Sequence, residues 1–346
     1  MENQLPSLVE VLRGPIIEAR HRGVIVALEP DGRILARLGD ENLITSTRSV
    51  IKPIQALPLI TSGAAERFNI TPRELAVACA SHNGEPVHTE AVAGLLAKIG
   101  LDEKALLCGA HPPYNEDAAR RLEREGKPFT QLHNNCSGKH AGMLATALHL
   151  GFSIEDYVSP NHPLQREIIY TLARMGELDR EMPIGIDGCS APTFGVPLKS
   201  LALAFARLTS LWSAGDSTIA EAAGSIVEAM TAHPEMIGGT KGRLDTDLLI
   251  AAGGRLICKV GAEAAYSIGV LPCRQFPHGL GIAIKIEDGS YRALGAVVVE
   301  TLAQLGLLAP SEQARLAIYH RPAIVNHRGL NAGEVRANFD LEFDRR

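Results

Sequence analysis

The spacing of hydrophobic positions divides the chain into two strand-rich ends and a helical middle. Residues 23–40 alternate apolar and polar positions on both sides of Asp31-Gly32, a pattern typical of a β-hairpin. Residues 255–272 read as two short strands, and residues 279–298 predict a second hairpin around Asp288-Gly289. Between these ends the apolar residues recur every three or four positions, which predicts helices. The predicted helical segments are residues 72–80, 88–100, 116–126, 137–151, 162–178, 198–208 and 217–230.

Strands at both ends with helices between them predict an α+β fold. One antiparallel sheet is then built from both termini, a mainly helical middle lobe packs against it, and the cleft between them is the expected site. We expect a single catalytic unit over residues 1–346, with a sheet lobe of roughly residues 1–48 and 250–346 and a helical lobe of roughly residues 49–249.

Composition excludes several classes of function. The chain has 4% aromatic residues, a net charge of -5 and no dense run of Lys or Arg, which argues against binding to nucleic acid or to a membrane surface. The N-terminus lacks a signal-peptide pattern, and the apolar stretch 293–308 is interrupted by Glu300 and too short to span a bilayer. Six scattered cysteines indicate free thiols in a reducing compartment, so we expect a cytoplasmic protein.

Ser49 and Lys52 stand three residues apart at the start of the apolar segment 45–60, which predicts the opening of a buried helix. Residues i and i+3 are neighbours on one helix face. A lysine that is kept from water holds its proton less tightly and can act as the base for a serine nucleophile. The spacing alone also fits a serine that only caps the helix. Arg48, directly before Ser49, can pair with an acidic substrate group or face solvent.

Two further triplets strengthen the catalytic interpretation. Ser81-His82-Asn83 follows a predicted helix, and Lys259-Val260-Gly261 lies on a predicted strand. Penicillin-binding proteins and β-lactamases carry Ser-x-x-Lys, Ser-Asp-Asn and Lys-Thr-Gly in this order, the last on a strand. Two departures are that Val260 replaces the usual hydroxyl residue and that the first two motifs lie close together in the sequence.

Two cysteines lie near other metal-ligating residue types. Residues 133–144 contain Cys136 and Lys139, and residues 184–192 contain Asp187 and Cys189 at the end of a predicted strand. Cysteines from separate segments can hold zinc, although small buried residues in glycine-rich turns are the simpler interpretation. His133 and His140 are more often capping or core residues than metal ligands. The glycine-rich stretch 236–249, which contains Arg243 and Asp245, is either a carboxylate site or, more simply, a flexible connection.

Residues 46–60, 80–92, 132–144, 185–198 and 259–270 together resemble the rhizobial-type L-asparaginase family. The resemblance implies a fold related to serine β-lactamases and bacterial glutaminases. It also implies hydrolysis of L-asparagine to L-aspartate and ammonia, and a homodimer. The implied site consists of the Ser–Lys pairs Ser49–Lys52 and Ser81–Lys259, and of a zinc site at Cys136, Lys139 and Cys189 that orients the substrate.

In this interpretation Ser49 attacks the side-chain amide while Lys52 takes its proton, and an acyl-enzyme forms. Ser81 and Lys259 relay protons to the leaving amine or activate the hydrolytic water. Two alternatives stay open: a glutaminase or β-lactamase-like acyl hydrolase on the same scaffold, and a zinc-stabilised binding protein whose Ser–Lys pairs are only buried hydrogen bonds. The expected substrate-binding residues are Arg48, His82, Asn83 and Asp187.

Overall fold

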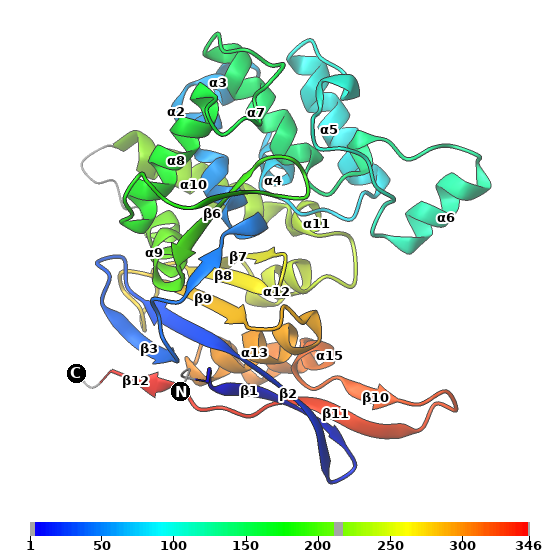
Figure 1. Cartoon of the computed structure of the whole chain (residues 1–346), viewed down its shortest axis with the longest axis vertical. Helices are drawn as coiled ribbons and strands as arrows, with labels where there is room; N and C mark the ends of the chain where they lie inside the picture. The colour runs from blue at the N-terminus through cyan, green and yellow to red at the C-terminus, as the bar shows by residue number, and fades with distance from the viewer. Residues whose placement is uncertain (1–3, 211–216, 345–346) are drawn as a thin grey trace.

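A computed structural model describes residues 4–210 and 217–344, and a large antiparallel sheet forms its base (Figure 1). The strands of this sheet are β1 (Ser7–Arg13), β2 (Ile16–Leu28), β3 (Ile34–Leu38), β7 (Leu256–Gly261), β8 (Ala265–Val270), β9 (Leu280–Ile286), β10 (Ala323–Val325), β11 (Asn331–Ala337) and β12 (Glu342–Phe343). Their order is β10-β11-β1-β2-β9-β8-β7, with β3 paired to β2 and β12 paired to β3. The prediction of one antiparallel sheet from both termini is therefore confirmed.

Two of the three predicted strand pairs are confirmed. The strands β2 and β3 pair across Asp31-Gly32, and β7 pairs with β8. The hairpin around Asp288-Gly289 is wrong, because β9 ends at Ile286 and the helix α13 (Tyr291–Gln304) follows the turn. Most residues of α13 between 293 and 302 are buried, and such a continuous apolar run cannot be assigned to strand or helix by periodicity alone.

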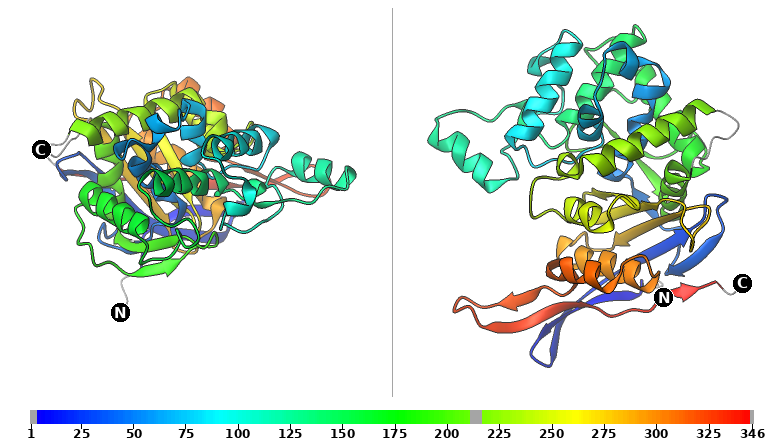
Figure 2. Two further views of the ribbon diagram at one scale, coloured as in Figure 1. Left: turned by 90° about the horizontal axis from the view of Figure 1, so that it is seen from above. Right: turned by 180° about the vertical axis from the view of Figure 1, so that it is seen from behind.

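All the predicted helical segments are confirmed, and they form the upper layer of the molecule (Figures 1 and 2). The segment 45–60 is broken into short pieces, with Pro53 and Pro58 in the first turns of two of them. The helices of this layer and of the C-terminal part are η1 (Arg48–Ile51), α1 (Lys52–Gln55), α2 (Leu57–Thr61), α3 (Ala64–Arg67), α4 (Pro72–Ala78), α5 (Pro86–Lys98), η2 (Glu103–Ala105), α6 (Glu116–Arg124), η3 (Gln131–His133), α7 (Ser137–His149), α8 (Pro163–Gly176), α9 (Leu198–Thr209), α10 (Ser217–Ala232), α11 (Pro234–Ile237), α12 (Leu244–Ala252), α14 (Pro310–Arg315) and α15 (Ala317–His320).

A small three-stranded sheet within the helical layer was not predicted as a unit. Its strands are β4 (Ile44–Ser46), β5 (Ile184–Ile186) and β6 (Pro192–Pro197), in the order β4-β6-β5. The sequence indicates β5, which ends immediately before Asp187. Because β4 leads directly into η1, this sheet fixes the place where Ser49 begins its helical turn.

Paired glycines allow α9 to pack directly on the large sheet. Gly269 of β8 and Gly281 of β9 are direct cross-strand partners. A Cβ atom at Gly281 would lie 1.8 Å from the carbonyl oxygen of Ala202, and one at Gly269 would lie 2.7 Å from that of Phe205. The middle of the chain and the sheet thus share one hydrophobic core. In residues 4–210 and 217–344, no helix is long and apolar enough to cross a membrane.

Candidate active site

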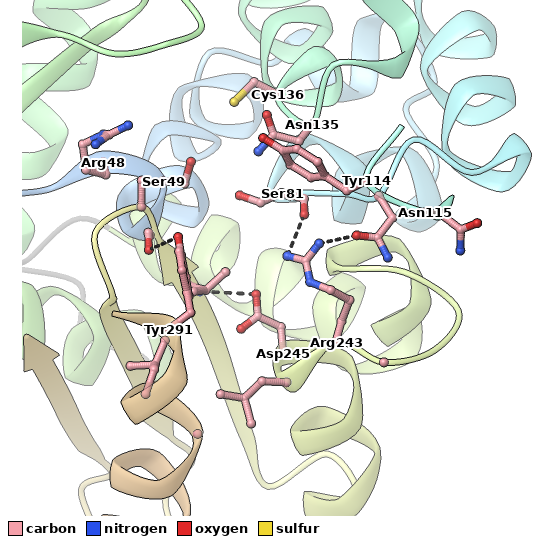
Figure 3. Close-up of a pocket in the computed structure, with 18 of the residues that line it drawn as sticks. Arg48, Ser49, Ser81, Tyr114, Asn115, Asn135, Cys136, Arg243, Asp245 and Tyr291 are labelled. Atoms are coloured by element: carbon pink, nitrogen blue, oxygen red, sulfur yellow. Dashed lines mark hydrogen bonds between the residues drawn. The ribbon is translucent and has the colours of Figure 1, made fainter. Parts of the chain in front are cut away.

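A cavity of about 1060 Å³ lies where the helical layer meets the end of β7 (Figure 3). Its wall is formed by η1, the loop after α4, the starts of α12 and α13, and the loops before α6, α7 and β6. The predicted cleft between the sheet and the helices is therefore present. Of the predicted catalytic and substrate-binding residues, the wall includes Arg48, Ser49, Ser81, Asn83 and Asp187.

A strained backbone turn presents Ser49 to this cavity. Arg48 has a φ of 42°, which is unfavourable for a residue with a Cβ atom. The turn is held because the Arg48 N–H donates to Thr193 Oγ1 at 2.9 Å, and its guanidinium contacts Asp187 Oδ1 at 2.8 and 3.0 Å. A Cβ atom at Gly261 would lie 2.8 Å from Val50, which explains the glycine in the Lys-Val-Gly triplet.

The hydroxyl of Ser81 lies between two buried lysines. Its Oγ atom is 3.1 Å from Lys52 Nζ and 2.8 Å from Lys259 Nζ. Lys52 also donates to the carbonyl oxygens of Ala80 at 2.5 Å and Asn135 at 3.3 Å, so three acceptors match the three protons of an ammonium group. Two ammonium groups at one oxygen would repel each other, which favours a neutral Lys259.

The pKa of Lys259 agrees with this assignment. Complete burial lowers the pKa of its ammonium to about 7, and the nearby Asp245 opposes the shift. Lys259 is therefore able to lose and regain a proton near neutral pH, which a general base requires.

Ser49 and Lys52 do not form the predicted contact in this structure. The Ser49 hydroxyl lines the cavity and has no hydrogen-bond partner among the residues that the structure describes, and Lys52 is directed to Ser81 instead. Hydrogen bonds of catalytic groups often form only when substrate is bound. The structure thus brings Ser49, Lys52, Ser81 and Lys259 to one place, but with both lysines on Ser81.

Arg243, from the glycine-rich stretch 236–249, lines the cavity. Its guanidinium donates to the side-chain oxygen of Asn83 and, at 3.1 Å, to the carbonyl oxygen of Ser81 (Figure 3). No acidic side chain in the described part of the chain forms an ion pair with it. An arginine held in place without a carboxylate partner is suited to bind an anion.

His82 lies behind the cavity wall. Its Nδ1 accepts the Gly84 N–H at 3.1 Å, so Nε2 carries the proton and donates to Ser137 Oγ at 2.9 Å. Burial, followed by the charges of His88 and Lys52, lowers the pKa of His82. Its imidazole supports the Ser81 loop and does not line the cavity, unlike its neighbour Asn83.

The predicted metal-site residues converge at a corner of the cavity. Lys139 Nζ lies 3.0 Å from Cys189 Sγ, and Cys136, Lys139 and Cys189 are all buried. Hydrogen bonding from Cys136, followed by the Lys139 charge, lowers the pKa of Cys189, so its thiolate form is favoured. Burial opposes any charge on Lys139, but Cys189 raises the pKa of that amine.

This donor set fits zinc on one condition. No three His, Cys, Asp or Glu side chains in the described residues form a metal-binding group, so Lys139 has to be the third ligand. A lysine binds a metal only after losing its proton, whereas Lys139 retains its proton strongly beside Cys189. Metal binding would then displace that proton.

Comparison with known proteins identifies the family. The family model described as L-asparaginase II matches residues 9–337. The chain belongs to the L-asparaginase II family. As a member of this family it is an amidohydrolase that acts on amides. The predicted α+β fold, an antiparallel sheet with a mainly helical middle, is confirmed.

Solved structures similar to this L-asparaginase II family member are distant. A probable glutaminase from Bacillus subtilis complexed with 6-diazo-5-oxo-L-norleucine is 16% identical, with 83% of this chain and 85% of that chain covered and a TM-score of 0.39. The covalent complex of Bacillus subtilis glutaminase with 5-oxo-L-norleucine is also 16% identical, with 87% and 93% covered and a TM-score of 0.38. No curated protein matches the sequence.

Three residues of the cavity wall are not among the catalytic, substrate-binding or metal residues that the sequence predicts. Two of them, Arg243 and Asp245, lie in the glycine-rich stretch 236–249, for which the sequence allows a carboxylate site or a flexible connection. Tyr291 lines the cavity and donates to the Gly261 carbonyl at 3.0 Å, and it was hidden because residues 279–298 were read as a hairpin.

Proposed function

We propose that this L-asparaginase II family member hydrolyses the side-chain amide of L-asparagine to L-aspartate and ammonia. The observation that carries the proposal is Ser81 Oγ held between Lys52 and Lys259 at the wall of a cavity. The same cavity contains Arg243, which forms no ion pair with the residues that the structure describes. The site therefore holds a base in Lys259, a cation in Lys52 and a receptor for a carboxylate in Arg243. Hydrolysis of an amino acid that has an amide side chain needs these three features.

Arg243 and Asp187 are proposed to bind the two charged groups of the free amino acid. The Arg243 guanidinium receives the α-carboxylate. Asp187 uses Oδ1 for Arg48 and for the Gly188 N–H at 2.7 Å, and its Oδ2 forms no hydrogen bond within the described residues. That oxygen is available to the α-ammonium group. Asn83 supports the site indirectly, because its side-chain oxygen holds Arg243.

Ser49 is the proposed nucleophile that attacks the side-chain amide carbon. Its hydroxyl lines the cavity and forms no hydrogen bond with the described residues, so attack on the amide carbon breaks no contact that the structure shows. Lys52 first gives one ammonium proton through Ser81 Oγ to the neutral Lys259. The neutral Lys52 then takes the Ser49 proton and passes it through Ser81 to the leaving amine, which departs as ammonia. Lys259 exchanges a proton with Ser81 at 2.8 Å and returns it when water hydrolyses the acyl-enzyme.

Ser81 is the second candidate for the nucleophile, because both lysines contact its hydroxyl. In that case Lys259 is the general base and the Lys52 ammonium stabilises the serine oxygen. A diazoketone analogue of asparagine that alkylates the nucleophile, followed by peptide mass spectrometry, separates the two assignments. An adduct on Ser49 supports the first, and an adduct on Ser81 in the intact enzyme overturns it.

Zinc and a homodimer remain part of the proposal. Cys136, Lys139 and Cys189 would hold the metal, which would supply a fixed positive charge that orients the substrate. Sedimentation of the purified enzyme tests the dimer. The low number of aromatic residues and the net charge of -5 support a small-molecule substrate over nucleic acid, and we propose a cytoplasmic location.

The decisive experiment measures ammonia release from L-asparagine and L-glutamine, with nitrocefin as a third substrate. We expect release from asparagine by the wild type and none by Ser49→Ala, with Ser62→Ala as the control outside the cavity. Preference for glutamine or cleavage of nitrocefin supports the alternative acyl hydrolases. A folded wild type that turns over no substrate supports a binding protein.

A further inference from the structure

Asp245 is a buried carboxylate that the chemistry described above does not use. It is the second residue of α12, and its Oδ2 lies 3.7 Å from Lys259 Nζ. The same oxygen accepts the Val260 N–H at 3.3 Å. Its Oδ1 is buried without a hydrogen-bond partner among the described residues. A carboxylate in such a place is unfavourable unless a positive charge compensates it.

The surroundings favour an ionised Asp245. The first turn of α12 presents unpaired backbone N–H groups and the positive end of the helix dipole. Lys259, which becomes a cation when it takes a proton, is in contact with the carboxylate, and the side chains of both residues are excluded from solvent. A buried charge without a partner is costly, so the proton on Lys259 and the charge on Asp245 depend on each other.

We propose that Asp245 is a positioning residue for Lys259: its buried carboxylate holds the lysine against Ser81 and supplies the negative charge that allows Lys259 to carry a proton during turnover. When Lys259 takes a proton from Ser81 Oγ, the resulting ammonium lies between that oxygen and Asp245 Oδ2. The same proton returns to Ser81 in the next half-reaction, so no other reactant is needed. This inference rests on the proposed Ser–Lys chemistry.

The other ionisable groups that face Lys259 cannot replace Asp245. Lys52 and Arg243 are cations, and both lower the pKa of Lys259. The Lys259 charge also acts on the thiols of Cys79 and Cys258, but burial raises the pKa of each, that of Cys79 to about 12, so they stay neutral. Cys136, from the loop before α7, raises the pKa of Lys259 as Asp245 does, but by less.

Removing the carboxylate should therefore make Lys259 a weaker base. In Asp245→Asn, burial and the two neighbouring cations still lower the pKa of Lys259, but the carboxylate charge that mainly opposes them is gone. We expect the pKa of Lys259 to fall by at least about one unit, as for a group that loses a close opposite charge. Asp247→Asn is the matched control, because Asp247 lies in the same helical turn but accepts a hydrogen bond from Tyr319.

The test measures Lys259 directly by ¹³C NMR of lysines labelled at Cε. The resonance that is missing in Lys259→Met identifies the residue, and its titration midpoint is compared in wild type, Asp245→Asn and Asp247→Asn. We expect the midpoint to be at least about one pH unit lower in Asp245→Asn and unchanged in Asp247→Asn. The acid limb of kcat/KM should move by the same amount in the same direction, whereas a purely structural defect lowers kcat without moving the limb.

The outcomes separate this inference from the proposed function. An unchanged or raised midpoint in Asp245→Asn overturns the role of Asp245, whatever the substrate. A lowered midpoint in an enzyme that does not hydrolyse asparagine supports the role and rejects the proposed substrate alone. Asp245→Ser, smaller and uncharged, replaces Asp245→Asn if that variant does not fold. Failure of both to fold while Asp247→Asn folds makes Asp245 a structural residue and overturns the proposal.

Discussion

The Nζ atom of Lys259 lies 2.8 Å from the Oγ atom of Ser81, and neither side chain has appreciable contact with solvent. The contact joins two segments that are 178 residues apart in the sequence. It is available for proton transfer because burial lowers the pKa of the lysine to about 7. Ordinary lysines, by comparison, are almost fully protonated at neutral pH.

The first prediction follows from the sign of that shift. Above pH 7 Lys259 is mainly neutral and accepts a proton, whereas below pH 7 it is increasingly protonated. We expect kcat/KM for asparagine to fall about tenfold for each pH unit below the midpoint. Neutral His82 does not contribute to this limb, because burial keeps its pKa well below the ordinary value. A profile that stays flat from pH 8 to pH 5.5 contradicts the assignment of Lys259 as the base.

The second prediction concerns the two lysines as a unit. Lys52→Met and Lys259→Met should each lower kcat at least about 100-fold, because each removes a group in contact with Ser81. The double variant should be little worse than the poorer single variant, as is usual for groups that act together. Steady-state kinetics and circular dichroism measure activity and folding, with the exposed Lys104→Met as control. Additive losses would show that the lysines act in separate steps.

The sequence predicts the elements better than the contacts between them. The helices form where the spacing of apolar residues predicts them. The order of the motifs Ser49-x-x-Lys52, Ser81-His82-Asn83 and Lys259-Val260-Gly261 predicts a shared site, and the three motifs do meet at one cavity. The i, i+3 rule for helices predicts a contact between Ser49 and Lys52. That contact is missing because the long lysine side chain reaches acceptors from two other segments.

The residues that were missed depend on packing that periodicity does not contain. Asp245 is identifiable as unusual only when its burial beside Lys259 is known. Tyr291 reaches the cavity because α13 replaces the expected strand. The zinc prediction, in contrast, rests on residues that do converge, and it needs a direct measurement.

The third prediction concerns recognition of the substrate carboxylate by Arg243. Arg243→Gln should raise KM for asparagine by about 10- to 100-fold, which corresponds to the loss of a charge-assisted hydrogen bond. Asparaginamide lacks the α-carboxylate, so the substitution should change its KM much less. Arg292→Gln, an exposed arginine at the same cavity, is the matched control. An equal rise in KM for both substrates would exclude Arg243 as the carboxylate receptor.

The fourth prediction concerns the metal. Enzyme purified without chelators should contain about one zinc ion per chain by elemental analysis, because a thiolate, a second thiol and an amine converge. Cys136→Ser and Cys189→Ser should each lose the metal, whereas Cys273→Ser, at an exposed cysteine, should retain it. Equal zinc content in all of these variants would place the metal elsewhere or show that it is adventitious.

The fifth prediction tests the contact that joins the helical layer to the sheet. Gly281→Ala places a Cβ atom 1.8 Å from the Ala202 carbonyl oxygen, which forces α9 away from β9. We expect the free energy of unfolding to fall by about 3 kcal/mol, at the upper end of the usual cost of overpacking.

Gly224→Ala is the control for this substitution. Gly224 lies within α10, and a Cβ atom there meets no other atom within 4 Å. Alanine is the better helix former, so this variant should be more stable than wild type by about 0.5–1 kcal/mol. Urea denaturation followed by circular dichroism measures both. If Gly281→Ala unfolds at the same urea concentration as wild type, α9 does not pack on β9 as closely as the structure shows.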